Sequence, residues 1–323
     1  MRLARILCQL VRGNAGAAVR VLFATPPFCS LRGEKDAQRM SSTHGREEYD
    51  APKAALATTV DEEEMNLRRL LPKMCTEMRK GSAGRIAVVG GSLEYTGAPF
   101  FAAQTALRLG ADLAFIYCAP DAATPIKCYS PELIVHPFLG DAQKMSAQLA
   151  RTKAIVVGPG LGREEKGREL FDIALAEAAK SKIPLIDGLF FLSQLQTKLI
   201  GKQLERAVLT PNRGELMRLV LQHLGEKLNP SDDKKSAEAT QKLAAKLRTT
   251  VYAKGPVDCI SYFGEQVECV AETGSPRRCG GQGDLLAGAL GVFSFWATGS
   301  ITAEDMVKEI PRVLIDIEGE PTL

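Results

Sequence analysis

The chain has 323 residues, of which 45% are hydrophobic and 24% charged. This composition excludes a disordered, collagen-like or coiled-coil protein, and the length suffices for a large α/β core. No run of eighteen apolar residues occurs, so the sequence predicts no transmembrane helix. Residues 1–40 hold seven Lys and Arg against two acidic residues, so the net charge of +3 resides in this segment; the rest carries about −2, which argues against nucleic-acid binding.

The N-terminal segment is basic and apolar. It contains no acidic residue before Glu34, and five arginines are spread among Leu, Val and Ala: Arg2, Arg5, Arg12, Arg20 and Arg32. This pattern predicts a mitochondrial transit peptide over residues 1–33, and the interruption of the apolar run 15–24 by Arg20 argues against a secretory signal. The alternatives are a nonspecific tail or a misassigned start codon in a cytoplasmic protein. Residues 34–66 are polar and are predicted to be a linker.

From Ile86 onward, short β-branched runs alternate with segments of helical periodicity. The predicted strands are Ile86–Gly90, Leu113–Cys118, Leu133–Pro137, Ala154–Gly158, Pro184–Asp187, Ala207–Thr210, Val251–Lys254 and Cys259–Phe263. The predicted helices are Pro99–Leu109, Ala142–Arg151, Glu164–Lys180, Glu215–Leu224, Ala237–Leu247 and Leu285–Trp296. Strands that are apolar on both faces and alternate with helices indicate a mostly parallel sheet covered on both sides.

Polar loops rich in Gly and Pro follow four of these strands, at residues 90–99, 158–162, 210–215 and 254–255. Each loop taken singly is compatible with a tight turn that needs glycine at positive φ. Ligands of parallel sheets bind beyond the carboxyl ends of the strands. Four such loops at one edge of the sheet therefore predict a shared ligand cleft.

Residues 277–284 have the sequence Arg-Arg-Cys-Gly-Gly-Gln-Gly-Asp and precede a predicted helix. The glycines allow successive backbone N–H groups to converge on an anion, and the helix start adds free N–H groups and partial positive charge. The segment is neither a Walker A motif nor a dinucleotide fingerprint. Asp284 is predicted to accept a proton from a hydroxyl that attacks the phosphate; the alternative role is a helix N-cap.

The chain has eight cysteines, at positions 8, 29, 75, 118, 128, 259, 269 and 279, and three histidines, His44, His136 and His223. No C-x-x-C pair occurs, and no zinc-ligand spacing can be assembled. We expect reduced, buried thiols in an intracellular protein.

With this glycine-rich loop placed after an alternating β/α body, the chain resembles the ribokinase-like superfamily. Five segments in order resemble the eukaryotic branch of the ATP-dependent NAD(P)H-hydrate dehydratase family: Gly-Gly-Ser-Leu-Glu-Tyr-Thr-Gly-Ala-Pro (90–99), Tyr-Ser-Pro-Glu-Leu-Ile-Val-His-Pro (129–137), Val-Gly-Pro-Gly-Leu-Gly (157–162), Leu-Thr-Pro-Asn (209–212) with Glu215, and residues 277–286. The resemblance covers about residues 67–296. It implies a ribokinase-like α/β domain over 67–323, with a mostly parallel central sheet and helices on both faces.

The resemblance also implies a repair enzyme that uses ATP and Mg²⁺ to dehydrate the (6S) hydrate of NADH or NADPH. A kinase-type site can phosphorylate the hydroxyl of the hydrate, which makes it a good leaving group. The implied partners are ATP and the hydrate, with no nucleic acid and no membrane. The sequence leaves open the oligomeric state (a homo-oligomer included), ATP or ADP use and the preferred hydrate.

Carried over residue by residue, the resemblance places Asp284 as the base at the hydroxyl. Further contacts to the hydrate are implied for Gly160, Asn212, Arg213, Gly214, Glu215, Leu216, Met217 and Arg218. Contacts to ATP are implied for Lys254, Gly255, Pro256, Val257, Asp258, Gly274, Ser275, Pro276, Arg277, Arg278, Cys279, Gly280, Gly281, Gln282 and Gly283. Glu215 is expected to reach Mg²⁺ through water, as carboxylates commonly do beside phosphates. The alternatives for Asn212 and Glu215 are a surface turn and a helix-start acid.

Two departures from the family are expected to weaken activity. Residues 185–189 read Leu-Ile-Asp-Gly-Leu, and from Ile186 onward they lack two residues of the family's Ile-Asp-Ala-Asp-Gly-Leu, one of them acidic. Residues 297–300 lead directly into a segment like the family's final helix, which suggests a segment missing near the C-terminus. We therefore expect weak nucleotide binding and slow turnover. The alternatives are a small-alcohol kinase of the hydroxymethylpyrimidine type and a nucleotide-binding variant impaired in catalysis.

Overall fold

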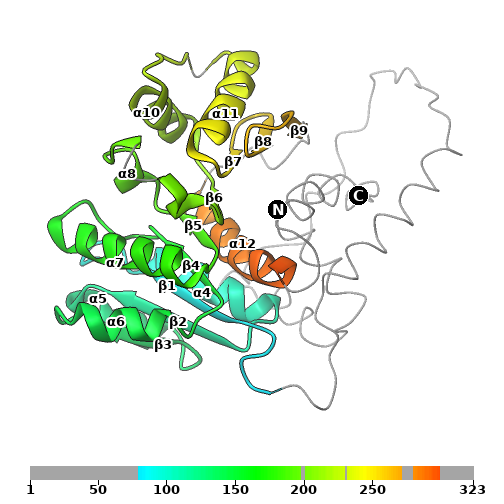
Figure 1. Cartoon of the computed structure of the whole chain (residues 1–323). Coiled ribbons are helices and arrows are strands. Elements are labelled where there is room, and N and C mark those ends of the chain that lie inside the picture. Colours follow the sequence, from blue (N-terminus) through cyan, green and yellow to red (C-terminus); the bar gives the residue numbers. More distant parts are fainter. Residues whose placement is uncertain (1–78, 198–200, 230, 271–278, 299–323) are drawn as a thin grey trace, which may run out of the picture.

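A central sheet runs through the computed structural model, which describes residues 79–197, 201–229, 231–270 and 279–298. Its nine described strands lie in the order β3-β2-β1-β4-β5-β6-β7-β8-β9 (Figure 1). The strands from β3 to β7 pair in parallel, and β8 and β9 join antiparallel at one edge. The strands are β1 Arg85–Val89, β2 Leu113–Cys118, β3 Ile134–Pro137, β4 Ala154–Val157, β5 Leu185–Asp187, β6 Ala207–Leu209, β7 Thr250–Ala253, β8 Asp258–Tyr262 and β9 Glu268–Val270.

Helices cover both faces of this sheet (Figure 1). One face packs against α4 (Gly97–Leu109), α5 (Pro120–Tyr129) and α12 (Gln282–Thr298). The other packs against α6 (Ala142–Leu149), α7 (Glu165–Ser181), α8 (Leu189–Leu192), α10 (Arg213–Leu224) and α11 (Asp233–Leu247), with a short 3₁₀ turn, η1 (Gly201–Leu204), beside them. This arrangement confirms the predicted α/β class with a mostly parallel sheet covered on both faces.

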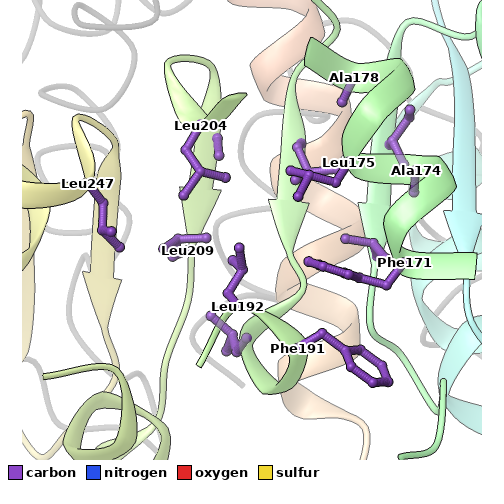
Figure 2. Close-up of a cluster of buried hydrophobic side chains, with 14 of the residues drawn as sticks. Phe171, Ala174, Leu175, Ala178, Phe191, Leu192, Leu204, Leu209 and Leu247 are labelled. Carbon is purple, nitrogen blue, oxygen red and sulfur yellow. The ribbon is translucent and has the colours of Figure 1, made fainter. Parts of the chain in front are cut away.

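Side-chain alternation divides the core into two layers. In β1, Ile86 and Val88 belong to the cluster under α4 and α12, whereas Ala87 and Val89 belong to the cluster under α7. All four are fully buried, as expected when successive residues of a strand point to opposite faces of a sheet that is covered twice. Figure 2 shows the second layer, where Phe171 and Leu175 of α7 lie beside the sheet.

The backbone of the long helix α12 closely approaches the backbone of α4. A Cβ at Gly288 would lie 2.2 Å from the carbonyl oxygen of Ala102 in α4, so no larger residue fits without moving one helix. Near the other end of α12, the indole N–H of Trp296 donates to the carbonyl oxygen of Ala83, just before β1. These contacts fix the direction of α12 across the sheet, and so fix where its N-terminus lies.

Most predicted elements are confirmed with shifts of a residue or two at their ends, but α11 begins four residues and α12 three residues earlier than predicted. The pattern missed α5, because Pro125 lies inside that helix, and it missed the short elements α8, η1 and β9. No helix within the described ranges is long and apolar enough to span a bilayer. The predicted transit peptide and linker lie outside the described residues.

The expectation for the cysteines needs a correction. Five cysteines fall among the described residues, and all are free thiols. Cys118 and Cys259 are buried as expected, but Cys128, Cys269 and Cys279 are exposed, so the prediction of buried thiols is wrong for these three. They lie on a helix surface, on the edge strand β9 and in the loop before α12, where no second layer covers them.

Candidate active site

The loops that follow β1 and β4 meet at the carboxyl edge of the sheet. The backbone N–H of Gly91 donates to the carbonyl oxygen of Pro159, at 3.0 Å. A Cβ at Gly90 would lie 2.0 Å from that same oxygen, so glycine is required for this approach. Gly160 adopts φ +61 and packs against the backbone of Tyr95. The predicted substrate contact Gly160 therefore lies where the two loops meet.

Polar side chains join the next three strand ends. The Oδ1 atom of Asp187, at the end of β5, accepts hydrogen bonds from the backbone N–H and the hydroxyl of Thr210, at 2.9 and 2.8 Å. The Nζ of Lys254, after β7, donates to the same Thr210 hydroxyl at 3.2 Å. Its backbone N–H donates to the carbonyl oxygen of Pro211 at 2.8 Å. One connected network thus holds the ends of β5, β6 and β7 together.

The predicted anion loop lies at the start of α12. Gly281 has φ +90, a conformation that glycine adopts without strain, and α12 begins at the next residue. The ring of Phe101, on α4, lies 3.0 Å from where a Cβ of Gly281 would be, and 42% of Phe101 is exposed. Cys279 and Gly280 are exposed, as a loop that receives a phosphate must be. The predicted ATP contacts 274–278 lie outside the described residues.

Asp284 lies in the first turn of α12, inside the helix. It is therefore not the N-cap residue, although an acid in the first turn also suits the partial positive charge of a helix N-terminus. Its pKa is raised to about 6, chiefly because partial burial disfavours the charge and secondly because Asp187 lies nearby, while Lys254 lowers it. A carboxylate with a pKa near 6 is ionised at neutral pH and still basic enough to accept a proton, which is the property required of a general base.

Lys254 and Asp284 belong to the same site. The Nζ of Lys254 lies 3.3 Å from where a Cβ of Gly283 would be, so its positive charge lies at the glycine-rich start of α12. The charges of Asp187 and Lys254 also interact. Burial raises the pKa of Asp187, whereas Lys254 and the hydrogen bonds from Thr210 lower it. The geometry thus brings together the end of β7 and the anion loop, as the sequence predicted.

The start of α10 is a capping box. The Oδ1 of Asn212 accepts from the backbone N–H of Glu215 at 3.1 Å, and the Oε2 of Glu215 accepts from the backbone N–H of Asn212 at 2.8 Å. Glu215 therefore does serve as an acid at the start of a helix, as the alternative had it, but this role uses only one of its carboxylate oxygens. Among the described residues, the other oxygen has no hydrogen-bond partner, so a water molecule could bind to it.

The remaining predicted contacts on α10 differ in accessibility. Arg213 forms an ion pair with Asp233 at the start of α11, so its guanidinium already has a partner. Leu216 is buried in the core, Met217 is half-buried, and Arg218 is exposed. Leu216 is therefore mainly a packing residue, although it also lines a small cavity beside Arg213 and Lys254.

The turn from β7 to β8 contains the other predicted ATP contacts. The carboxylate of Asp258 accepts from the backbone N–H of Gly255 and from the hydroxyl of Tyr252, both at 2.8 Å. Asp258 thus shapes the turn, and Pro256 is exposed at its tip. Val257 lines a cavity of about 10 Å³ with neighbouring residues of α10 and α11, which has room for one water molecule and not for a nucleotide.

Sequence reasoning did not identify Asp187 and Thr210 as site residues. Asp187 drew notice only because its loop is short. The signal that points to both is their position: Asp187 is the polar last residue of an otherwise apolar strand, and Thr210 directly follows an apolar strand. In a parallel sheet, such residues meet at the carboxyl edge.

Comparison with known proteins identifies a family. The family model described as NAD(P)H-hydrate dehydratase matches residues 86–308. An ATP-dependent (S)-NAD(P)H-hydrate dehydratase from Caenorhabditis briggsae is 45% identical over 234 residues, which cover 71% of this chain and 76% of that protein. Proteins with the same name from Ixodes scapularis (47% over 231 residues; 71% and 72%) and Danio rerio (43% over 264 residues; 80% and 78%) are similar.

Solved structures share the fold. A ribokinase-like superfamily protein from Enterococcus faecalis superposes with a TM-score of 0.60 at 21% identity, over 77% of this chain and 94% of that one. The ADP/ATP-dependent NAD(P)H-hydrate dehydratase from Bacillus subtilis, co-crystallised with ATP and Mg²⁺, superposes with a TM-score of 0.54 at 22% identity, over 79% and 97%. These likenesses confirm the predicted ribokinase-like fold.

Proposed function

The chain belongs to the NAD(P)H-hydrate dehydratase family, and we propose that it performs the ATP-dependent dehydration of the (6S) hydrate of NADH or NADPH. The position of Asp284 is the observation that connects this activity with particular residues. Its carboxylate lies at the start of α12, beside Lys254 and the glycine-rich anion loop. A base and an anion site next to each other are what phosphorylation of a hydroxyl requires.

In the proposed reaction, Asp284 accepts the proton of the hydrate's hydroxyl. The hydroxyl oxygen bonds to the terminal phosphorus of ATP while the bond from that phosphorus to the bridging oxygen breaks, and ADP leaves. The C–O bond between the ring carbon and the new phosphate group then breaks, the phosphate leaves with the electron pair, and the neighbouring carbon loses a proton, which the departing phosphate can take up. The ring double bond is restored, and the products are ADP, inorganic phosphate and NADH or NADPH.

In this proposal, backbone N–H groups and Lys254 stabilise the negative charge of the transferred phosphate. The N–H groups at Gly280–Gly283 and the first turn of α12 face the transferred phosphate, where the helix start also favours negative charge. The network through Thr210 and Asp187 holds the Lys254 ammonium in place. Preorganised donors of this kind do not have to reorient as charge develops in the transition state.

The donor set fits Mg²⁺ bound mainly by ATP. No group of three His, Cys, Asp or Glu among the described residues could hold a metal by itself. Mg²⁺ commonly keeps several waters and takes one or two carboxylates together with substrate phosphates. The unused oxygen of Glu215 suits such a water, and the ion would supply neutralisation of phosphate charge. A protein with one well-placed carboxylate and a phosphate cradle meets that requirement.

The test of the proposal compares Asp284→Asn with the unchanged protein. Each is given ATP, Mg²⁺ and NADH hydrate, and the return of NADH absorbance is followed together with the release of inorganic phosphate. Loss of the base is expected to lower the rate about 10²–10⁴-fold, because Asn keeps the size and loses the proton acceptor. Nucleotide affinity should change much less, since a negative charge is removed beside the phosphates.

Asp121→Asn serves as the matched control, because Asp121 is also an acid in the first turn of a helix, α5, and is exposed. It should retain the full rate. Near-normal turnover of Asp284→Asn would refute the role of Asp284. Release of ADP with accumulation of a stable phosphorylated product, and without NADH, would instead identify a kinase and refute dehydration.

A further inference from the structure

Two cysteines face each other across the antiparallel edge of the sheet. Cys259 of β8 and Cys269 of β9 are direct partners in the strand register, and their sulfur atoms lie 3.1 Å apart. Directly opposed residues of antiparallel strands have Cα atoms about 4.5–5.5 Å apart, which falls within the range of about 4.4–6.8 Å that disulfides use. The backbone is therefore already placed for a bond between these two sulfur atoms.

The two thiols differ in accessibility. Cys269 is exposed on the edge strand, whereas Cys259 is buried, and this burial raises the pKa of its thiol to about 12. A buried thiol with a high pKa is a poor nucleophile toward reagents in solution, while an exposed one is open to attack. Cys269 is thus the residue that meets an external oxidant, and Cys259 is the partner beneath it.

We propose that Cys259 and Cys269 form a reversible modification site, which low-molecular-weight disulfides such as oxidised glutathione convert into a cross-strand disulfide. The proposal stands on the strand register, the sulfur separation and the exposure of Cys269. It does not depend on the dehydratase reaction.

The conversion takes two exchange steps. The thiolate of Cys269 attacks one sulfur of the small disulfide; a mixed disulfide forms, the original S–S bond breaks and a small thiolate leaves. The sulfur of Cys259, having lost its proton to water, then attacks the sulfur of Cys269. The Cys259–Cys269 bond forms, and the second small thiol leaves. The two cysteines lose two electrons and two protons, and the small disulfide is reduced to two thiols.

The neighbouring contacts give this bond a structural effect. Cys259 follows Asp258, whose carboxylate holds the turn from β7 to β8, and its sulfur lies 3.9 Å from the carbonyl oxygen of Val257. A disulfide tethers β9, an edge strand of three residues, to β8 directly beside that turn. Opening of the β8–β9 pair then requires breaking a covalent bond, so exchange of the amide hydrogens in β9 should slow by at least about tenfold.

The experiment incubates the full chain in mixtures of oxidised and reduced glutathione, quenches with an alkylating reagent and maps the peptides by mass spectrometry. The expected result is a cross-link between the peptides that contain Cys259 and Cys269, reversed by reductant, with slower hydrogen exchange in β9. Cys269→Ser is an exposed substitution and should abolish the cross-link, leaving Cys259 unmodified.

Cys128 provides the control, because it is exposed on α5 and no other cysteine of the described residues forms a contact with it. In Cys128→Ser, the cross-link should form as in the unchanged chain. Two results would overturn the proposal: free, fully alkylated Cys259 and Cys269 in the most oxidising mixture, or a mixed disulfide with glutathione that persists on Cys269. The readouts are thiol state and exchange, so a failure of the proposed enzymatic function leaves this test unaffected.

Discussion

The base proposed at Asp284 would cost the folded protein stability at neutral pH. Its raised pKa means that the folded protein holds the proton more tightly than the unfolded chain, because partial burial disfavours the charge. The contribution of the protonated form to stability is fully present below the unfolded pKa near 4 and is lost as pH rises through about 6. At neutral pH the folded protein therefore carries a strained, charged base.

Replacement of this base should accordingly stabilise the protein. We expect Asp284→Asn to raise the free energy of unfolding at pH 7 by about 1 kcal/mol, a value reduced for solvent screening because the group is partly exposed. The gain should shrink as pH falls toward 4. Urea unfolding of both proteins at several pH values measures it, and equal stability at every pH would contradict the interpretation.

Asp187 should act on catalysis through Asp284. The rate should fall below pH about 6, as Asp284 takes up its proton. Because the charge of Asp187 raises the pKa of Asp284, Asp187→Asn should move this acidic limb to lower pH, while its amide oxygen can still accept from Thr210. The measurement is kcat against pH for both proteins. An unmoved limb with only a uniform loss of rate would show that Asp187 serves structure alone.

Among the elements, α12 combines two proposed tasks, and both require small residues. Its first turn needs small residues for the anion, and its middle needs a small residue at Gly288 for the contact with α4. An alanine there gains about 1 kcal/mol of helix propensity but overpacks the helix pair. The steric cost decides the outcome, because the obstructing atom is a backbone oxygen that no rotamer change can move.

We therefore expect Gly288→Ala to lower the free energy of unfolding by about 1–3 kcal/mol, net of its helix propensity. Gly97→Ala, in the first turn of α4, is the matched change, because its nearest neighbour would be a flexible ring at 3.8 Å. Chemical denaturation of the two variants beside the unchanged protein checks this. A Gly288→Ala protein as stable as Gly97→Ala would mean that the helices can separate freely.

The sequence predicted elements better than it predicted their junctions. Apolar runs identify buried strands regardless of context, which is why β2 was predicted with its observed bounds. The helix α5 escaped because Pro125 ordinarily ends a helix, yet here it lies within one. The bond from Lys254 to Thr210 and the pKa of Asp284 depend on residues brought together only by folding, and no local pattern contains them.

For the molecule as a whole, we propose import into mitochondria, on the arginine-spaced, acid-free segment before Glu34. Residues 1–60 fused to a fluorescent protein should direct it to mitochondria. Substitution of the five arginines in residues 1–33 by Gln should abolish this, since import depends on positive charge. Diffuse cytosolic fluorescence of the unchanged fusion would refute the proposal.

The placement of α12 has a thermodynamic consequence. In the proposed function its first turn receives the phosphate, and its body forms one side of the core, so the nucleotide would bind only to a chain whose core is assembled. Ligand that binds the folded state alone stabilises it by about 2.7 kcal/mol at a hundredfold excess over Kd. The protein's resistance to unfolding should therefore follow the ATP level around it, and a shortage of ATP should expose more of the chain to proteases.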